Sequence, residues 1–178
     1  MNTNDRPTRI LMVCTGNICR STMAHAIAEQ SAAQAGIRIV VDSAGVSDEE
    51  RGNPIDPRAA RVLRDAGYDV PDHRARQVSA AELDQWDLVL AMTGRHLSAL
   101  QRLANHGGTA YRSSAATGRD GQDRGPLICL YRDFDPEGSG DVPDPWYGGH
   151  QDFVDTRDVI ERVTPRLLSF VSQGVLRS

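Results

Sequence analysis

Cys14, Arg20 and Asp144 are residue types that together can carry out chemistry on a phosphate group. Five residues separate Cys14 from Arg20, and Ser21 follows, within the segment VCTGNICRST of residues 13–22. A short loop that closes onto a helix N-terminus turns backbone N–H groups inward, and these groups attract an anion together with the helix dipole. The planar guanidinium of Arg20 adds a bidentate donor for two phosphate oxygens. The spacing therefore predicts a phosphate-binding loop.

Cys14 is the candidate nucleophile of this loop. The positive field that attracts a phosphate also stabilises a thiolate, and a thiolate aimed at the bound phosphorus can displace its leaving group in line. Because the loop neutralises the charge of the phosphoryl oxygens in the transition state, we expect neither a metal ion nor a cofactor. Ser21 can donate a hydrogen bond to the sulfur when Cys14 becomes the leaving group of a second step.

Asp144 is the candidate general acid, because the leaving oxygen of a phosphate ester needs a proton. It lies in the segment VPDPWYGG, residues 142–149, where a proline on each side stiffens the chain. Trp146 and Tyr147 follow in a chain that is otherwise poor in aromatic residues. A carboxylic acid beside two aromatic side chains suits a flat aryl phosphate as the substrate.

The order of apolar and amphipathic segments predicts the elements that position these residues. Strands are expected at residues 9–13, 38–43, 87–92 and 126–131. Helices are expected at residues 21–36 and 57–67, within residues 78–86, after the third strand with Leu97, Leu100 and Leu103 on one face, and at about 152–173. Strands that alternate with helices predict an α/β fold, namely a single domain with a four-stranded parallel sheet and helices on both faces. Ligands of such sheets bind at the carboxyl ends of the strands, where the Cys14 loop begins.

Local signals mark several helix ends. Asp56 followed by Pro57 predicts a helix N-terminus, and Ser79 with Glu82 predicts a capping box. Pro165 lies inside the last helical segment, where we expect it to kink or break the helix.

Length and composition fit one domain over residues 1–178 with a net charge of −4 at pH 7. Residues 1–7 are expected to be a disordered tail, and residues 105–125 a surface loop rich in Gly, Ser and Arg. No apolar run approaches the ~20 residues that span a bilayer, and no basic cluster indicates nucleic-acid binding. We therefore expect a cytoplasmic monomer that binds neither membranes nor nucleic acid. Cys14, Cys19 and Cys129 have neither disulfide-framework nor zinc spacing.

Four segments in the order VCTGNICRS, DSAG, DHRARQ and DPWYGG resemble the low-molecular-weight protein tyrosine phosphatases of bacterial type. The resemblance covers nearly the whole chain and implies a Rossmann-like, phosphotyrosine phosphatase I-like fold. It implies metal-independent hydrolysis of phosphotyrosine in proteins, and of small aryl phosphates, through a phosphocysteine intermediate. The implied partners are a phosphotyrosine-containing protein and a cognate tyrosine kinase.

The same resemblance assigns roles to individual residues. It implies Cys14 as nucleophile, Arg20 as phosphate clamp, and Asp144 as general acid and later general base. The other implied site residues are Thr15, Gly16, Asn17, Ile18, Cys19 and Ser21 in the phosphate-binding loop, Ser43 and His73 as its supports, and Trp146 and Tyr147 in the substrate pocket.

Several points stay open at this stage. Cys19 either packs behind the loop or, as the resemblance implies, forms a disulfide with Cys14 that makes the enzyme redox-sensitive. Many family members place an aromatic residue in the loop after the second strand, and residues 46–54 have none. His96, His106 and His150 are expected to face solvent.

Three alternative functions use the same residues. An arsenate reductase needs two further cysteines, and only Cys129 lies beyond the loop. Protein-arginine phosphatases tend to have Thr where Ile18 stands, and lack the aromatic pair. A phosphotyrosine-binding protein without turnover does not need Cys14, Arg20 and Asp144 all to be present.

Overall fold

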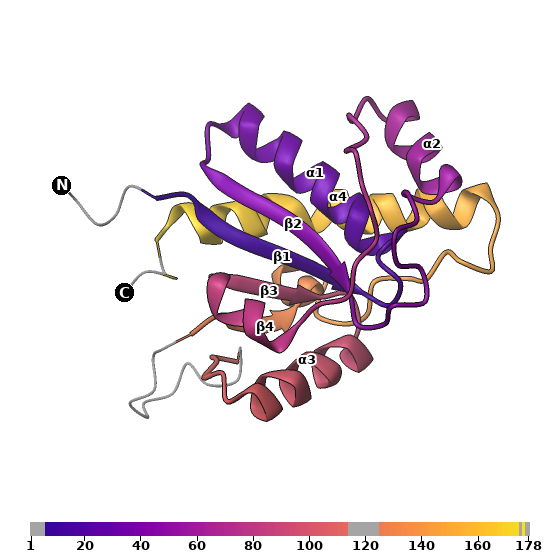
Figure 1. Ribbon diagram of the computed structural model, residues 1–178. Coiled ribbons are helices and arrows are strands. Elements are labelled where there is room, and N and C mark those ends of the chain that lie inside the picture. Colours follow the sequence, from indigo (N-terminus) through magenta and orange to yellow (C-terminus); the bar gives the residue numbers. More distant parts are fainter. Residues whose placement is uncertain (1–5, 114–124, 175, 177–178) are drawn as a thin grey trace.

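Four parallel strands form the centre of the molecule in the order β2-β1-β3-β4 (Figure 1). This computed structural model describes residues 6–113, 125–174 and 176. The strands are β1 (Thr8–Cys14), β2 (Ile39–Gly45), β3 (Leu88–Ala91) and β4 (Leu127–Leu130). The expected α/β fold with a four-stranded parallel sheet is confirmed.

Helices cover both faces of the sheet. The α-helices are α1 (Arg20–Ala35), α2 (Pro57–Asp65), α3 (Gly94–Gly107) and α4 (His150–Ser172), and the short 3-10 helices are η1 (Ala80–Gln85) and η3 (Tyr131–Phe134). α1 and α4 pack on each other over one face, and α3 lies against the other (Figure 1).

Strand β1 shows why its sequence is an unbroken apolar run. Successive side chains of a strand point to opposite faces, and here both faces are covered. Ile10 and Met12 join the hydrophobic cluster under α1 and α4, whereas Leu11 and Val13 join the cluster under α3. All four side chains are fully buried, so β1 holds the two layers together.

The predicted helix signals have different outcomes. The Asp56 side chain caps α2 by accepting from the Arg58 N–H, and Ser79 and Glu82 form the capping box of η1, as predicted. Pro165 was predicted to kink or break the helix, and the helix is not broken there, because α4 continues through this residue. Proline removes one helical hydrogen bond, but the buried residues on either side, including Val163 and Leu167, anchor the helix in the core.

The expected tail and surface loop lie mostly outside the described residues. Residues 1–5 and 114–124 are not described. Of the expected tail, the described residue Arg6 forms an ion pair with Asp87. Residues 105–107 complete helix α3, and Arg112 forms a bridge to β4 at Leu127. No helix in the described part of the chain is both long and apolar enough to cross a membrane.

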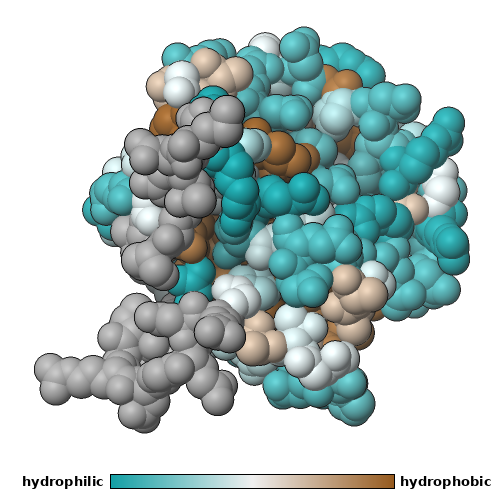
Figure 2. Space-filling view, turned by 60° about the vertical axis from the view of Figure 1, so that its left-hand side comes forward, coloured by the Kyte–Doolittle hydropathy of each residue, from teal (hydrophilic) through white to brown (hydrophobic). Residues whose placement is uncertain are grey.

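The face at the amino ends of the strands is mostly hydrophilic, and its visible hydrophobic side chains form small separate groups (Figure 2). The loop that carries Cys14 and Arg20 lies at the opposite, carboxyl edge of the sheet (Figure 1). The candidate chemistry is therefore gathered at the edge where parallel sheets bind their ligands.

Candidate active site

Residues 14–20 form a loop between the end of β1 and the first turn of α1. Cys14 is the last residue of β1, and Arg20 is the first residue of α1. The segment after β2 fixes the start of the loop, because the Val46 N–H donates to the Cys14 carbonyl at 2.9 Å. A Cβ at Gly45 would collide with the Thr15 carbonyl oxygen, so this close approach requires glycine.

The Cys14 sulfur faces one hydrogen-bonding group of its own loop and one in the first turn of α1. Its Sγ lies 3.0 Å from Ser21 Oγ, and the Asn17 N–H donates to it at 3.3 Å. The Cys14 residue is only 3% exposed. Hydrogen bonds of this kind can stabilise the negative charge on the sulfur when it acts as a leaving group.

Asn17 holds the loop in shape. Its backbone has a left-handed φ of 63°, and it is the only non-glycine residue with positive φ in the described part of the chain. The side-chain Nδ2 donates to Ser21 Oγ at 3.0 Å and to Ser43 Oγ at 2.9 Å, and Oδ1 accepts from the Arg76 N–H at 3.0 Å. His73 Nε2 donates to the Asn17 carbonyl at 2.6 Å. These bonds offset the strain of the backbone.

Burial lowers the pKa of His73, and the hydrogen bond to Asn17 only partly opposes this effect. The imidazole is therefore neutral at pH 7. Because a carbonyl can only accept, its proton lies on Nε2. Asn17 and Ser21 were predicted as residues of the phosphate-binding loop, and Ser43 and His73 as its supports. The structure brings all four together through these hydrogen bonds.

Arg20 and Asp144 meet across the pocket although they are 124 positions apart in the sequence. Arg20 Nη2 donates to Asp144 Oδ2 at 3.0 Å, and the Trp146 N–H donates to Asp144 Oδ1 at 3.2 Å. Arg20 is buried, whereas the Asp144 side chain is 51% exposed. The guanidinium is thus fixed in the floor of the site, and the carboxylate lies at its rim.

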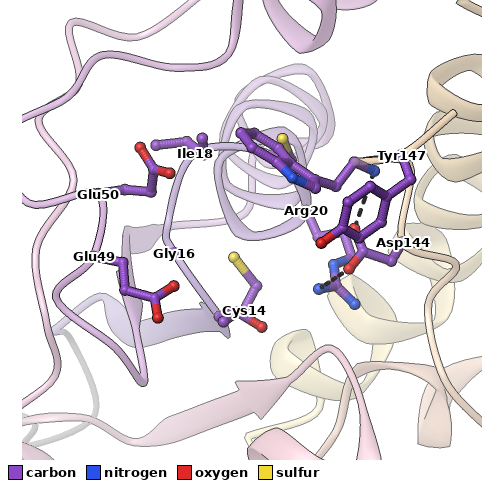
Figure 3. A pocket seen from close by; sticks show the side chains of 11 residues that line it. Cys14, Gly16, Ile18, Arg20, Glu49, Glu50, Asp144 and Tyr147 are labelled. Atoms are coloured by element: carbon purple, nitrogen blue, oxygen red, sulfur yellow. Dashed lines mark hydrogen bonds and ion pairs between the residues drawn. The ribbon is translucent and has the colours of Figure 1, made fainter. Parts of the chain in front are cut away.

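A cavity of about 210 Å³ opens above the loop. Its lining residues are Cys14, Thr15, Gly16, Ile18, Cys19, Arg20, Glu49, Glu50, Asp144, Trp146 and Tyr147. Asp144 and Tyr147 lie on one side of Cys14, and Glu49 and Glu50 on the other (Figure 3). The Tyr147 side chain is 97% exposed, so it forms the outer rim of the cavity rather than a packed wall.

Glu49 and Glu50 are pocket residues that the sequence analysis missed. Glu50 packs against the loop so closely that a Cβ at Gly16 would lie 2.9 Å from its Cγ. Its Oε2 accepts from Asn53 Nδ2 at 2.7 Å, and within the described ranges neither carboxylate forms an ion pair. The only signal in the sequence was the missing aromatic residue of this loop, which left one wall of the pocket unassigned.

His96 was expected to face solvent, and this prediction was wrong. It is 4% exposed, and its Nε2 lies 2.8 Å from Thr15 Oγ1 in the phosphate-binding loop. Helix α3 begins beside that loop, so its third residue points inward. Burial lowers the pKa of His96 to about 4, and the nearby charge of Arg20 adds to this effect. The imidazole is therefore neutral at pH 7.

All three cysteines are free and buried in the structure. Burial raises the pKa of Cys19 far above its usual value, so this thiol stays protonated while it lines the pocket. Cys129 is a buried residue of β4. In the described residues, no three His, Cys, Asp or Glu side chains form a group that could hold a metal ion.

Comparison with known proteins places this site in context. The family model for low molecular weight phosphotyrosine protein phosphatase matches residues 9–176. A low molecular weight protein-tyrosine-phosphatase of Streptomyces coelicolor is 39% identical over 94% of this chain and 95% of its own length. The low molecular weight protein-tyrosine phosphatase A of Mycobacterium tuberculosis is 36% identical over 97% of this chain and 96% of its own length. The crystal structure of YfkJ from Bacillus subtilis has a TM-score of 0.78 at 29% identity, covering 95% of this chain and 97% of that one.

Proposed function

This chain belongs to the low molecular weight phosphotyrosine protein phosphatase family and hydrolyses phosphotyrosine in proteins, and we propose that Cys14, Arg20 and Asp144 carry out the reaction. The observation that carries this assignment is one cavity lined by a nucleophile, a phosphate clamp and a carboxyl group. The thiol has two hydrogen-bonding neighbours at its sulfur. The other residues of the loop act as its phosphate cradle.

The first step transfers the phosphoryl group to the enzyme. The thiolate of Cys14 attacks phosphorus in line, so that an S–P bond forms while the bond between phosphorus and the tyrosine oxygen breaks. The leaving phenolate takes a proton from the Asp144 carboxyl group. Arg20 and the loop N–H groups hold the phosphoryl oxygens throughout.

The second step releases phosphate. Asp144, now a carboxylate, takes a proton from a water molecule as the water oxygen attacks phosphorus. The S–P bond breaks, and Cys14 leaves as a thiolate that the Ser21 hydroxyl and the Asn17 N–H stabilise. The nucleophile, the proton donor and acceptor, and the groups that hold the phosphoryl oxygens all belong to this chain, so the proposal requires no cofactor.

A tyrosine kinase is the class of enzyme that must supply the substrate, because it makes the phosphotyrosine that this reaction consumes. We propose that one copy of the chain is the active unit, since every residue in the mechanism comes from one chain. Trp146 and Tyr147 at the mouth of the cavity favour an aromatic phosphate ester over the shorter phosphoserine.

The test compares kcat/KM on peptides of one sequence that carry phosphotyrosine, phosphoserine or phosphoarginine, with EDTA present. We expect turnover of the phosphotyrosine peptide alone, its loss in Cys14→Ala, and normal turnover in the control Asp84→Asn, whose carboxylate is exposed away from the pocket. Activity that EDTA abolishes, or that Cys14→Ala retains, would overturn the mechanism. Preference for phosphoarginine would overturn the substrate assignment.

A further inference from the structure

Arg58, in the first turn of α2, connects two walls of the catalytic pocket. Its Nη1 donates to the Trp146 carbonyl at 3.2 Å, and its Nη2 donates to Asp56 Oδ2 at 2.9 Å. The Asp56 N–H in turn donates to the Ile18 carbonyl at 2.9 Å. The pair Asp56–Arg58 therefore joins the phosphate-binding loop, at Ile18, to the segment that carries Asp144, at Trp146.

The guanidinium of Arg58 is held from several sides. Asp56 Oδ1 accepts from both the backbone N–H and the Nε of Arg58, at 2.8 and 3.1 Å. The guanidinium carbon lies 4.6 Å from the ring centroid of Phe153, a fully buried residue of α4, and 5.4 Å from that of Trp146. Both contacts are favourable cation–π geometry. Arg58 is thus anchored to α2 and α4 while it holds the Trp146 main chain and ring.

The charges of this pair persist over the working pH range. Burial raises the pKa of the Asp56 carboxyl, but the hydrogen bonds and charge of Arg58 outweigh this effect, and the pKa is lowered overall. The hydrogen bond to Asp56 raises the pKa of Arg58 in return. Protonation of Asp56 therefore does not release the contact near neutral pH.

We propose that Arg58 is a positioning residue for the general acid, an inference that rests on the proposed role of Asp144. The Trp146 N–H donates to Asp144 Oδ1, so the place of the Trp146 main chain sets the direction of the carboxyl group. Arg58 fixes that main chain from its carbonyl side. Because the same pair holds Ile18, the acid keeps a fixed place relative to the loop that binds the phosphorus.

This role makes a specific kinetic prediction. The tyrosine phenol has a pKa of about 10, so it is a poor leaving group and needs a proton from the general acid. Dinitrophenol is far more acidic and leaves as the phenolate without a proton. A residue that positions the acid therefore affects phosphotyrosine much more than dinitrophenyl phosphate. A residue that only stabilises the fold affects both substrates equally.

The experiment measures kcat/KM on a phosphotyrosine peptide and on dinitrophenyl phosphate, because kcat/KM reports the steps up to loss of the phenol. In Arg58→Gln, kcat/KM is expected to fall about tenfold on the peptide and less than about twofold on dinitrophenyl phosphate. The tenfold loss is a fraction of the ~10²-fold or more that a general acid contributes to the rate. Arg58→Lys should lie between wild type and Arg58→Gln, because an ammonium group cannot reproduce the fork. The control Arg61→Gln, whose side chain is 74% exposed on the same helix, should resemble wild type on both substrates.

The Asp144→Asn background separates the possible failures. If Arg58 acts through Asp144, Arg58→Gln should cause no further loss on the peptide in that background. Equal losses on both substrates, or a full additional loss beside Asp144→Asn, would overturn the role of Arg58 while leaving Asp144 as the acid. If Asp144→Asn itself shows no dependence on the leaving group, the proposed acid is wrong, and the inference about Arg58 fails with it.

Discussion

Replacing Asn17 with alanine tests whether its network holds the phosphate-binding loop. The substitution removes three hydrogen bonds, to Ser21, Ser43 and the Arg76 N–H. At about 1 kcal/mol net for each bond, the loss is about 3 kcal/mol. The left-handed φ of 63° adds about 1 kcal/mol, because alanine adopts this conformation less readily than asparagine. The expected total is about 4 kcal/mol in the free energy of unfolding.

This loss is large compared with the ~5–15 kcal/mol stability of a typical domain. Urea unfolding followed by circular dichroism measures it directly. The matched control is Asn105→Ala, an exposed position in the last turn of α3, where the change should stay within about 0.5 kcal/mol.

Activity should fall further than stability alone explains. A loop that loses its shape misplaces the Cys14 sulfur, and a displacement of about 1 Å costs on the order of 100-fold in rate. We therefore expect kcat/KM of Asn17→Ala to fall by about that factor under conditions where the variant is folded. An Asn17→Ala protein within 1 kcal/mol of wild type, with normal kcat/KM, would refute the role given to this network.

Three further predictions concern the walls of the site. The free energy of unfolding should fall as the pH drops from about 6.5 towards 4, by at most about 1.4 kcal/mol per pH unit, because His96 binds a proton in the unfolded chain but stays neutral in the folded one. Urea unfolding at several pH values should show a weaker pH dependence of this free energy for His96→Gln than for the wild type. An equal pH dependence in the two proteins would contradict the prediction. Glu49→Gln with Glu50→Gln removes two negative charges from the pocket wall and should lower KM for an aryl phosphate several-fold at low salt, with a smaller difference at high salt. The control Asp69→Asn with Asp84→Asn makes the same charge change at exposed sites away from the pocket, and an equal shift in KM there would show that only net charge matters. Trp146→Ala should raise KM for aryl phosphates about 3- to 10-fold through loss of the aromatic wall, and an unchanged KM would exclude contact between that ring and the substrate.

The parts of the fold and site that the sequence predicted depend on local patterns. The apolar run of β1 is buried on both faces, and Asp56 and Ser79 cap helices in ways that involve only near neighbours in the chain. The phosphate-binding loop is equally local, since seven consecutive residues from Cys14 to Arg20 form it. The resemblance to the phosphatase family, stated from four short segments, is confirmed by the match over residues 9–176.

The parts that the sequence did not predict depend on tertiary contacts. His96 contacts Thr15, which is 81 positions away in the sequence. The sequence pattern of its helix does not indicate whether the third residue, His96, is buried or exposed to solvent. Glu50 lies in an irregular loop, where no periodicity assigns a facing direction. The intrinsic cost of Pro165 to a helix predicted a kink or a break, but α4 is not broken there, because burial of the neighbouring side chains outweighs that cost.

Trapping the phosphoenzyme tests the central claim most directly. Excess enzyme is mixed with a radiolabelled phosphotyrosine peptide, the reaction is stopped by denaturation within a single turnover, and the labelled residue is located by mass spectrometry. The proposed mechanism predicts phosphate on the sulfur of Cys14 and none in Cys14→Ala. With radiolabelled dinitrophenyl phosphate in place of the peptide, it predicts more phosphoenzyme in Asp144→Asn than in the wild type. Label on any other residue, or full phosphate release by Cys14→Ala, would contradict it.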